Sequence, residues 1–310
     1  MTLAAAAFFA RRLDRVGLRL GLPETLLGLL TALAADAPET SSAIAAVVKG
    51  EHDVGLGVIL GSNVFNLAAM VGLSAIIAGG VRIRREALAV EGAVGVTATV
   101  IVGALVLELV GPWVTLGLLA VVLVPYLTLL GLGPGRSPRA LRRFFGEPHR
   151  PDHVLKHGER VLVPALTLIP ALAVIVAGAT GMVDAGLRLA DRWSVPDVIV
   201  GIVVLAILTS LPNAFTAVRL ALQRRGSALV SETLNSNTTN LLFGISVPAL
   251  FIGLGSTSAL TGFDLGWLLF LNLVVLALLA RTRGVGQSEG AAILLLYAVF
   301  VVVQIVAEST

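Results

Sequence analysis

The chain has 310 residues, of which 56% are hydrophobic and only 13% are charged, and its mean hydropathy is +0.95. A soluble globular protein carries about 25% charged residues, so this composition excludes an ordinary soluble domain and indicates a membrane protein. The chain has no cysteine, which excludes disulfide bonds and metal sites built from thiolates.

Apolar runs of about 20 residues, the length that crosses a bilayer, follow one another along the chain. Residues 1–10 would form a helix only about 15 Å long, so we interpret them as a shortened first span. A signal peptide is the alternative, but Arg11, Arg12 and Arg15 follow this run instead of preceding it. The other nine expected spans are 22–48, 54–79, 87–110, 112–133, 160–187, 194–222, 227–254, 263–280 and 288–307.

The distribution of positive charge predicts how these spans are oriented. If residues 134–159 are cytoplasmic and the spans alternate, 19 of the 22 Lys and Arg residues fall on the cytoplasmic side. This bias is what insertion into a membrane requires, so the basic pI of 9.9 needs no nucleic-acid partner. The sequence therefore predicts an N-terminal transmembrane repeat at 1–133, a basic cytoplasmic loop at 134–159 and a C-terminal transmembrane repeat at 160–310, in a multi-pass protein of the plasma or inner membrane.

The two halves contain related segments. Residues 22–76 can be aligned with 195–250, and the alignment pairs Pro38 with Pro212 and Glu39 with Asn213. The interval from Glu39 to Asn66 is 27 residues, and so is the interval from Asn213 to Asn240. The loop inside the first segment is expected outside and the loop inside the second is expected inside. The fold class expected is therefore an all-α membrane protein of about ten helices in two inverted five-helix repeats.

A carboxylate in the middle of a span is costly unless it is paired or faces water, which makes it a candidate functional residue. Asp36 and Glu39 are such acids, three residues apart, and they flank Pro38. Because a proline in mid-span frees a backbone carbonyl, Pro38 and Pro212 predict two broken helices that face one cavity. The aligned segments offer only oxygen ligands, which suit hard cations such as Ca²⁺, Na⁺ and Mg²⁺. The candidate ligands are Asp36, Glu39, Ser62, Asn66, Thr209, Ser210, Asn213, Ser236 and Asn240.

These motifs resemble those of the calcium/cation antiporter superfamily, which includes the sodium/calcium exchangers and their prokaryotic relatives. The family pairs a G-T-S-x-P-E type motif with a G-S-N-x-x-N type motif in each half. The corresponding stretches are AADAPE (34–39) with GSNVFN (61–66), and LTSLPN (208–213) with NSNTTN (235–240). The resemblance implies exchange of Ca²⁺ for Na⁺ by alternating access, with the motif acids as central ligands and no cofactor beyond the transported cations.

The chain departs from this family pattern in its acids. Asn213 stands where the second half normally carries an acid, whereas Asp36 stands where the first half normally carries a hydroxyl. Glu232, one helical turn before Ser236, either restores a carboxylate or serves as a capping or vestibule residue. Two close acids suit proton coupling as well as sodium coupling, so an H⁺-coupled or other cation exchanger stays open as an alternative. Asn213 and the shortened first span leave a transport-dead regulatory relative open as well.

Other features carry no assigned role. His149, His153 and His157 recur every four residues in the basic loop, as either a metal or pH sensor or a solvated loop. Glu91 and Glu108 lie in or near the fourth of the ten spans. We expect no enzymatic activity, because the chain lacks the G-x-G-D and H-E-x-x-H motifs of intramembrane proteases. The expected partners are inorganic cations and the lipid bilayer, and the sequence leaves the oligomeric state open.

Overall fold

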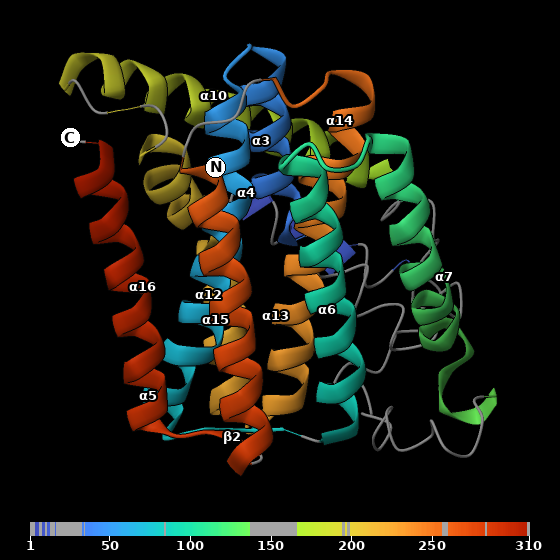
Figure 1. Cartoon of the computed structure of the whole chain (residues 1–310). Helices are drawn as coiled ribbons and strands as arrows, with labels where there is room; N and C mark the ends of the chain where they lie inside the picture. The colour runs from blue at the N-terminus through green and yellow to red at the C-terminus, as the bar shows by residue number, and fades with distance from the viewer. Residues whose placement is uncertain are drawn as a thin grey trace.

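The computed structural model describes residues 35–83, 85–136, 166–193, 199–255, 260–282 and 284–308, together with isolated positions elsewhere. Figure 1 shows that the described chain is a bundle of helices, with one short strand pair at the end of the bundle. The expected shortened span at 1–10, the segment 22–34 and nearly all of the loop 134–159 with its three histidines lie outside the described residues, apart from isolated positions.

The elements follow the expected spans closely from residue 37 onward. The α-helices are α3 (Ala37–Val48), α4 (His52–Asn66), α5 (Ser74–Ala78), α6 (Arg85–Val106), α7 (Pro112–Arg136), α10 (Leu168–Trp193), α12 (Ala206–Leu222), α13 (Gly226–Thr239), α14 (Val247–Phe251), α15 (Thr261–Thr282) and α16 (Gln287–Glu308). The π-helical segments are η1 (Leu67–Leu73), η2 (Val200–Leu205) and η3 (Asn240–Ser246), and the strands are β1 (Val81–Arg82) and β2 (Gly284–Val285).

Among the described residues, seven helical stretches are long and apolar enough to cross a membrane. They are His52–Ala78, Leu88–Val106, Pro112–Leu130, Leu168–Arg192, Val200–Leu222, Thr261–Arg281 and Gln287–Ala307. A stretch of this length and hydropathy is stable only in hydrocarbon or in a protein core. Because several of these helices leave most of their residues at least partly unburied, the chain is an integral, multi-pass membrane protein.

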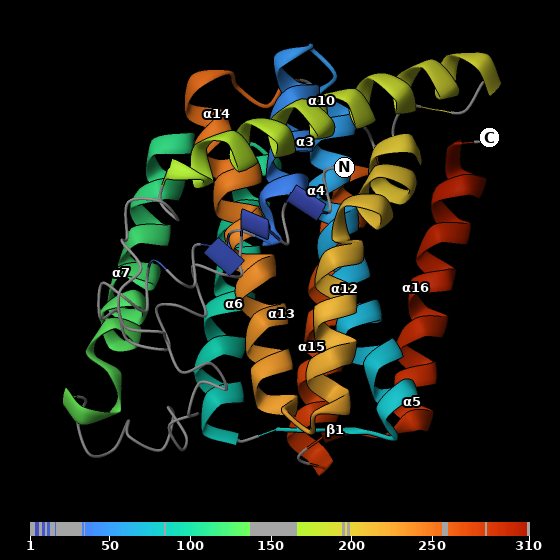
Figure 2. The same ribbon diagram turned by 180° about the vertical axis from the view of Figure 1, so that it is seen from behind.

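Two helical hairpins lie at opposite ends of the bundle. The turn between α3 and α4 lies at the end that α10 crosses, and the turn between α12 and α13 lies at the end of the β1–β2 pair (Figures 1 and 2). Lys49 in the first turn forms a salt bridge with Asp184 of α10. Gly226, which follows the second turn, packs against the backbone of Arg82 in β1. The first hairpin thus points away from the second.

One helix differs in direction from the rest. The segment 160–187 was expected to be a span, and α10 covers most of it. Figure 2 shows that α10 runs across the end of the bundle, at a steep angle to α12, α13 and α16. It packs there against α3 and η2, so its direction follows from this packing and not from its hydropathy.

The two matching prolines do not act alike. Pro38 lies in the first turn of α3, where its missing N–H has no intrahelical partner to lose. Pro212, by contrast, lies inside α12, which continues through it. The expectation of a break at Pro212 is therefore wrong. A proline removes a single backbone donor, the N–H group that would bond to the Leu208 carbonyl, and α12 continues on both sides of this one missing bond.

The close approach of α4 to η2 allows no side chain at two positions. A Cβ atom at Gly61 would overlap the carbonyl oxygen of Ile202 and lie 2.8 Å from its Cα atom, and a Cβ atom at Gly201 would lie 2.6 Å from the Val54 carbonyl oxygen. Both neighbours are backbone, which cannot move aside as a flexible side chain can. These glycines therefore hold the first half of the chain against the second.

We expect Gly61→Ala to lower the stability of the protein, although alanine is the better helix former by about 1 kcal/mol. The added methyl group forces α4 and η2 apart, and such overpacking costs about 1–3 kcal/mol. The apparent melting temperature of the detergent-solubilised protein measures this loss. The matched control is Gly117→Ala in α7, where nothing lies within 4 Å of the new Cβ atom. Equal melting temperatures for the two variants would contradict the prediction.

Candidate cation-binding site

Two acids from the first half of the chain meet polar side chains from the second half inside the bundle. Asp36 immediately precedes α3 as its N-cap residue, and Glu39 lies in the first turn of that helix. Their exposed fractions are 2% and 0%. Pro38 lies between them in the first turn of the helix, so both carboxylates extend from the same helix end toward α12 and α13.

Among the described residues, the hydrogen-bond donors to the Asp36 carboxylate are side chains of the second half. Asn213 Nδ2 and Ser236 Oγ donate to Asp36 Oδ1 at 2.8 and 2.5 Å. Thr239 Oγ1 donates to Asp36 Oδ2 at 2.7 Å. Hydrogen bonds to a charged acceptor are stronger than those between neutral groups. This acid therefore connects the start of α3 with both α12 and α13.

The Glu39 carboxylate is held on one side only. Ser210 Oγ and Asn213 Nδ2 donate to Glu39 Oε1 at 3.0 and 3.1 Å. The Asn213 amide nitrogen thus bridges Asp36 and Glu39. An acid at position 213 would add a third negative charge here, whereas the amide supplies two N–H groups to the two carboxylates. In the described part of the chain, neither carboxylate forms a salt bridge.

Four oxygen atoms in this region are buried and have no hydrogen-bond partner. The unpartnered atoms are Glu39 Oε2, Asn66 Oδ1, Asn213 Oδ1 and Asn240 Oδ1. A buried acceptor without a partner costs about 1–3 kcal/mol. Carboxylate and amide oxygens are also the ligands that hard cations prefer. A cation bound among these atoms would therefore remove the cost of leaving them unpaired.

The asparagines of the two motifs form reciprocal contacts. Asn63 Nδ2 donates to the Asn237 carbonyl, and Asn237 Nδ2 donates to the Asn63 carbonyl, both at 3.1 Å. Asn66 Nδ2 donates to Asn237 Oδ1 at 3.3 Å, and Asn240 Nδ2 donates to Asn63 Oδ1 at 3.1 Å. Each bond has a counterpart when the two halves are exchanged. Reciprocal bonds of this kind are what two halves related by a pseudo-two-fold axis would form.

The contacts around the two acids also correspond to one another when the two halves of the chain are interchanged. The alignment pairs Asp36 with Ser210 and Glu39 with Asn213. The bond from Asn213 to Asp36 thus corresponds to the bond from Ser210 to Glu39. Ser236 also accepts hydrogen bonds from Asn66 and Asn213, at 3.2 and 3.4 Å. The acids and the asparagines therefore belong to one connected polar network between α3, α4, α12 and α13.

Three of the expected site residues form no hydrogen bond with the two acids among the described residues. Ser62 Oγ and Thr209 Oγ1 both donate to the Ala206 carbonyl, at 3.4 and 3.3 Å, and Thr209 Oγ1 also donates to Leu205 at 2.8 Å. Their hydroxyl hydrogens satisfy backbone carbonyls of the second half. Among the described residues, no hydrogen bond connects Glu232 with Asp36 or Glu39, and Glu232 is half-buried. The structure thus brings together Asp36, Glu39, Asn66, Ser210, Asn213, Ser236 and Asn240.

The sequence pattern missed Thr239. Its hydroxyl is a direct partner of Asp36, and its exposed fraction is 9%. Alignment of the halves pairs Thr239 with Phe65, so the internal repeat contains no signal for it. The signal available was its position between Asn237 and Asn240 in NSNTTN, a polar run in an otherwise apolar span. Only the register of α13 against α3 shows that this hydroxyl faces the acid.

Histidine and acid clusters of the kind that bind zinc do not account for this region. The described residues contain no group of three or more His, Cys, Asp or Glu side chains that could hold a metal ion. Two carboxylates with several amide and hydroxyl oxygens suit a hard cation instead. The geometry therefore matches the ligand chemistry of an exchanged alkali or alkaline-earth cation.

A sequence profile for the sodium/calcium exchanger protein family matches residues 1–136 and 163–306. The chain belongs to the sodium/calcium exchanger family. The sodium/calcium exchanger MaX1 of Methanosarcina acetivorans is 28% identical over 137 residues, which cover 44% of this chain and 39% of that protein. The matched part of this chain thus spans about two fifths of the length of that relative. The putative antiporter CaxA of Alkalimonas amylolytica is 22% identical over 301 residues, which cover 90% of this chain and 87% of that protein.

The fold agrees with that of a solved relative. The sodium-calcium exchanger NCX_Mj superposes with a TM-score of 0.67 at 19% identity, and the match covers 97% of this chain and 94% of that chain. At this identity the likeness shows the fold alone. This member of the sodium/calcium exchanger family therefore combines the fold of NCX_Mj with its own arrangement of acids, namely Asp36 and Glu39 in the first half and Asn213 in the second.

Proposed function

We propose that the chain is a secondary active antiporter that exchanges Ca²⁺ for Na⁺ at the site formed by α3, α4, α12 and α13. The observation that carries this proposal is the pair of buried carboxylates, one with an unpartnered oxygen, together with three unpartnered amide oxygens. Two carboxylates balance the charge of one divalent ion, and the amide oxygens complete an oxygen shell. The name of the relative MaX1, a sodium/calcium exchanger, supports the same pair of ions.

The arrangement of the two halves supports transport by alternating access. The site lies where segments of both halves meet, which is where transporters with inverted repeats bind their ions. We propose two inverted five-helix repeats at 1–133 and 160–310, joined by a cytoplasmic loop at 134–159. The opposed hairpin turns and the reciprocal asparagine contacts support this arrangement. Rocking of one half against the other would then open the site to either side of the membrane.

Ion uptake into proteoliposomes tests the proposed exchange. We expect radioactive Ca²⁺ to accumulate when the vesicles contain Na⁺ and the outer solution does not, because outward Na⁺ flux drives inward Ca²⁺ flux. Vesicles with an outward H⁺ gradient, or with no gradient, are measured in parallel. Ca²⁺ uptake that is driven only by the H⁺ gradient would show that the coupling ion is the proton and not Na⁺. Ca²⁺ binding without uptake under any gradient would indicate a transport-dead relative and would contradict the proposal.

A further inference from the structure

Glu91 is a buried acid that the central site does not use. It lies in the first third of α6, toward the end of the bundle where β1 and β2 pair, and its exposed fraction is 4%. Helix α6 packs against α7, α13 and α15. A carboxylate at such a position is costly unless it is neutralised, so Glu91 is a second candidate ion-binding residue.

The hydrogen bonds of Glu91 leave one carboxylate oxygen free. Ser231 Oγ of α13 donates to Glu91 Oε1 at 2.5 Å, whereas the buried Oε2 atom has no partner. Asn235 Nδ2 donates to Ser231 Oγ at 3.4 Å, and Tyr126 of α7 donates to Asn235 Oδ1 at 2.7 Å. These four residues form a polar group that joins three helices within an apolar region. An unpartnered oxygen at this depth indicates a missing ligand.

The other ionisable groups around α6 supply no positive charge to Glu91. From α7 the ionisable neighbour is Tyr126, and from α13 it is Glu232, with Arg225 at the N-cap of that helix. Helix α15 has Asp264 and Arg281 near its two ends, and Leu276 between them packs on Gly92. No salt bridge to Glu91 is present among the described residues. Among the described residues, then, no cationic side chain neutralises Glu91, and a ligand from solution can do so.

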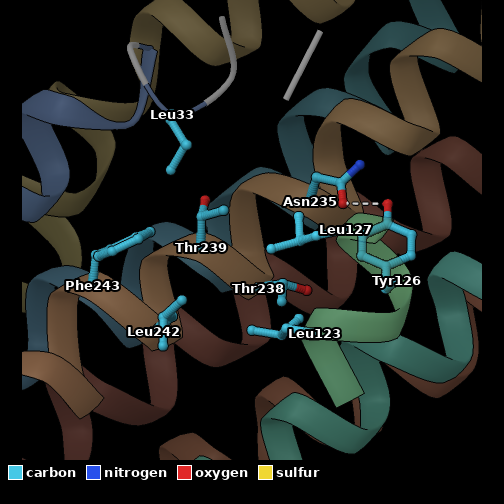
Figure 3. Close-up of a pocket in the computed structure, with 9 residues that line it drawn as sticks. All are labelled: Leu33, Leu123, Tyr126, Leu127, Asn235, Thr238, Thr239, Leu242 and Phe243. Carbon is cyan, nitrogen blue, oxygen red and sulfur yellow. Dashed lines mark hydrogen bonds between the residues drawn. The ribbon is translucent and has the colours of Figure 1, made fainter. Parts of the chain in front are cut away.

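A proton fits this position better than a metal ion. A bound metal ion needs several oxygen ligands at once, whereas the oxygens of Ser231 and Asn235 already take part in other hydrogen bonds. A proton needs only the free carboxylate oxygen and no cavity of its own. The cavity of about 100 Å³ between α7 and α13 is lined by Tyr126 and Asn235 but not by Glu91 (Figure 3).

One face of α13 connects Glu91 with the central site. Ser231, Asn235 and Thr239 are spaced four residues apart, which is about one helical turn per step. The first of them donates to Glu91 and the last donates to Asp36, at 2.7 Å. Figure 3 shows Asn235 and Thr239 along the same wall of the cavity, with the Tyr126 hydroxyl directed at Asn235. A shift of α13 that follows a change at Glu91 would therefore reach the Asp36 partners.

We propose that Glu91 is a second ion-binding residue, that its ligand is a proton, and that α13 links its occupancy to cation binding at Asp36 and Glu39. This inference rests on the proposed antiport function only for the linkage. The proton binds to and leaves the Glu91 carboxyl group as H⁺, with no change in covalent bonding elsewhere. Protonation neutralises the acid at the end of α13 opposite to the cation site.

Infrared difference spectroscopy of the full-length protein in lipid vesicles tests the proton site directly. We expect a carbonyl stretching band of a protonated carboxyl group that appears and disappears as the pH is changed, and that is absent in Glu91→Gln. Glutamine keeps the acceptor for Ser231 but cannot titrate. The matched control is Glu108→Gln, at an exposed position in the turn after α6, which should leave the band unchanged. An unchanged band in Glu91→Gln would overturn the proton site.

Cation flux in the same vesicles tests the linkage. We expect Glu91→Gln to transport the cation with at least a threefold weaker dependence on pH than the original protein. Identical pH profiles of the two proteins would overturn the linkage. If the original protein transports no cation, the proposed antiport fails, but the infrared band still decides whether Glu91 binds a proton.

A second variant tests the same assignment if Glu91→Gln does not fold. Ser231→Ala keeps the acid and removes the donor to Oε1, so we expect the carboxyl band to shift in frequency as the carbonyl loses its hydrogen bond. A band at the original frequency would show that it belongs to another acid and would overturn the assignment to Glu91.

Discussion

We expect Glu39→Gln to abolish cation transport while the protein still folds. Glutamine has nearly the same shape as glutamate and keeps the oxygen that accepts from Ser210 and Asn213. It removes one of the two negative charges that a divalent ion would meet. Removing one partner of a buried charge pair costs about 3–5 kcal/mol, which corresponds to a loss of affinity of at least about a hundredfold.

Uptake of radioactive Ca²⁺ into proteoliposomes measures the loss of transport, and the apparent melting temperature without cations measures folding. We expect the melting temperature to be equal to or above that of the original protein, because the substitution removes a buried charge. Ser42→Ala is the matched control one turn further along α3, where the buried hydroxyl has no hydrogen-bond partner. Cation flux at the original rate in Glu39→Gln would show that the site at Asp36 and Glu39 is not needed for transport, which would contradict the prediction.

We expect Asp36→Asn to lower the affinity for divalent cations much more than the affinity for monovalent cations. We expect Ca²⁺ affinity to fall by at least about a hundredfold, because a single remaining carboxylate cannot balance two positive charges. Na⁺ affinity should fall much less, since Glu39 still balances one charge. The direction of this difference is specific to this chain, whose second acid lies at position 36 and not at position 213.

The surroundings of Asp36 can accommodate the amide. Asn213 and Ser236 still find an acceptor oxygen at position 36. The new NH₂ group faces Thr239, whose hydroxyl can accept it and instead donate to the Ser236 carbonyl, 3.0 Å away. The shift of melting temperature with Ca²⁺ or Na⁺ concentration measures the two affinities, and Ser42→Ala again serves as the control. Equal losses for both ions would contradict the role of Asp36 as the second charge.

The positions of most helices could be predicted from the sequence because hydropathy and length are local properties. The expected spans 112–133 and 288–307 correspond to α7 and α16, within a few residues. The direction of α10 could not be predicted in this way. An apolar helix that crosses the bundle end has the same composition as one that runs along the bundle, so only its contacts with α3 and η2 distinguish the two.

The candidate site was predicted by residue type but not by contact. The paired motifs contain Asp36, Glu39, Ser210, Asn213 and Ser236, and hydrogen bonds join these side chains in one region of the structure. They also placed Thr209 among the ligands, whereas its hydroxyl hydrogen bonds to its own helix. A spacing of residues predicts a shared helix face, but the rotation of that helix against its neighbours determines which hydroxyl meets a carboxylate.

The amino-acid sequence by itself determined that this chain lies in a membrane, that its two halves contain matching motifs and that its acids could serve a hard cation. Only the tertiary structure decided that Asn213 bridges both carboxylates, that Thr239 completes the hold on Asp36, that α12 continues through Pro212, and that Ser231 meets Glu91. The physical reason is that hydropathy acts along the chain, whereas these hydrogen bonds join residues more than 100 positions apart. Their partners are set by how whole helices pack.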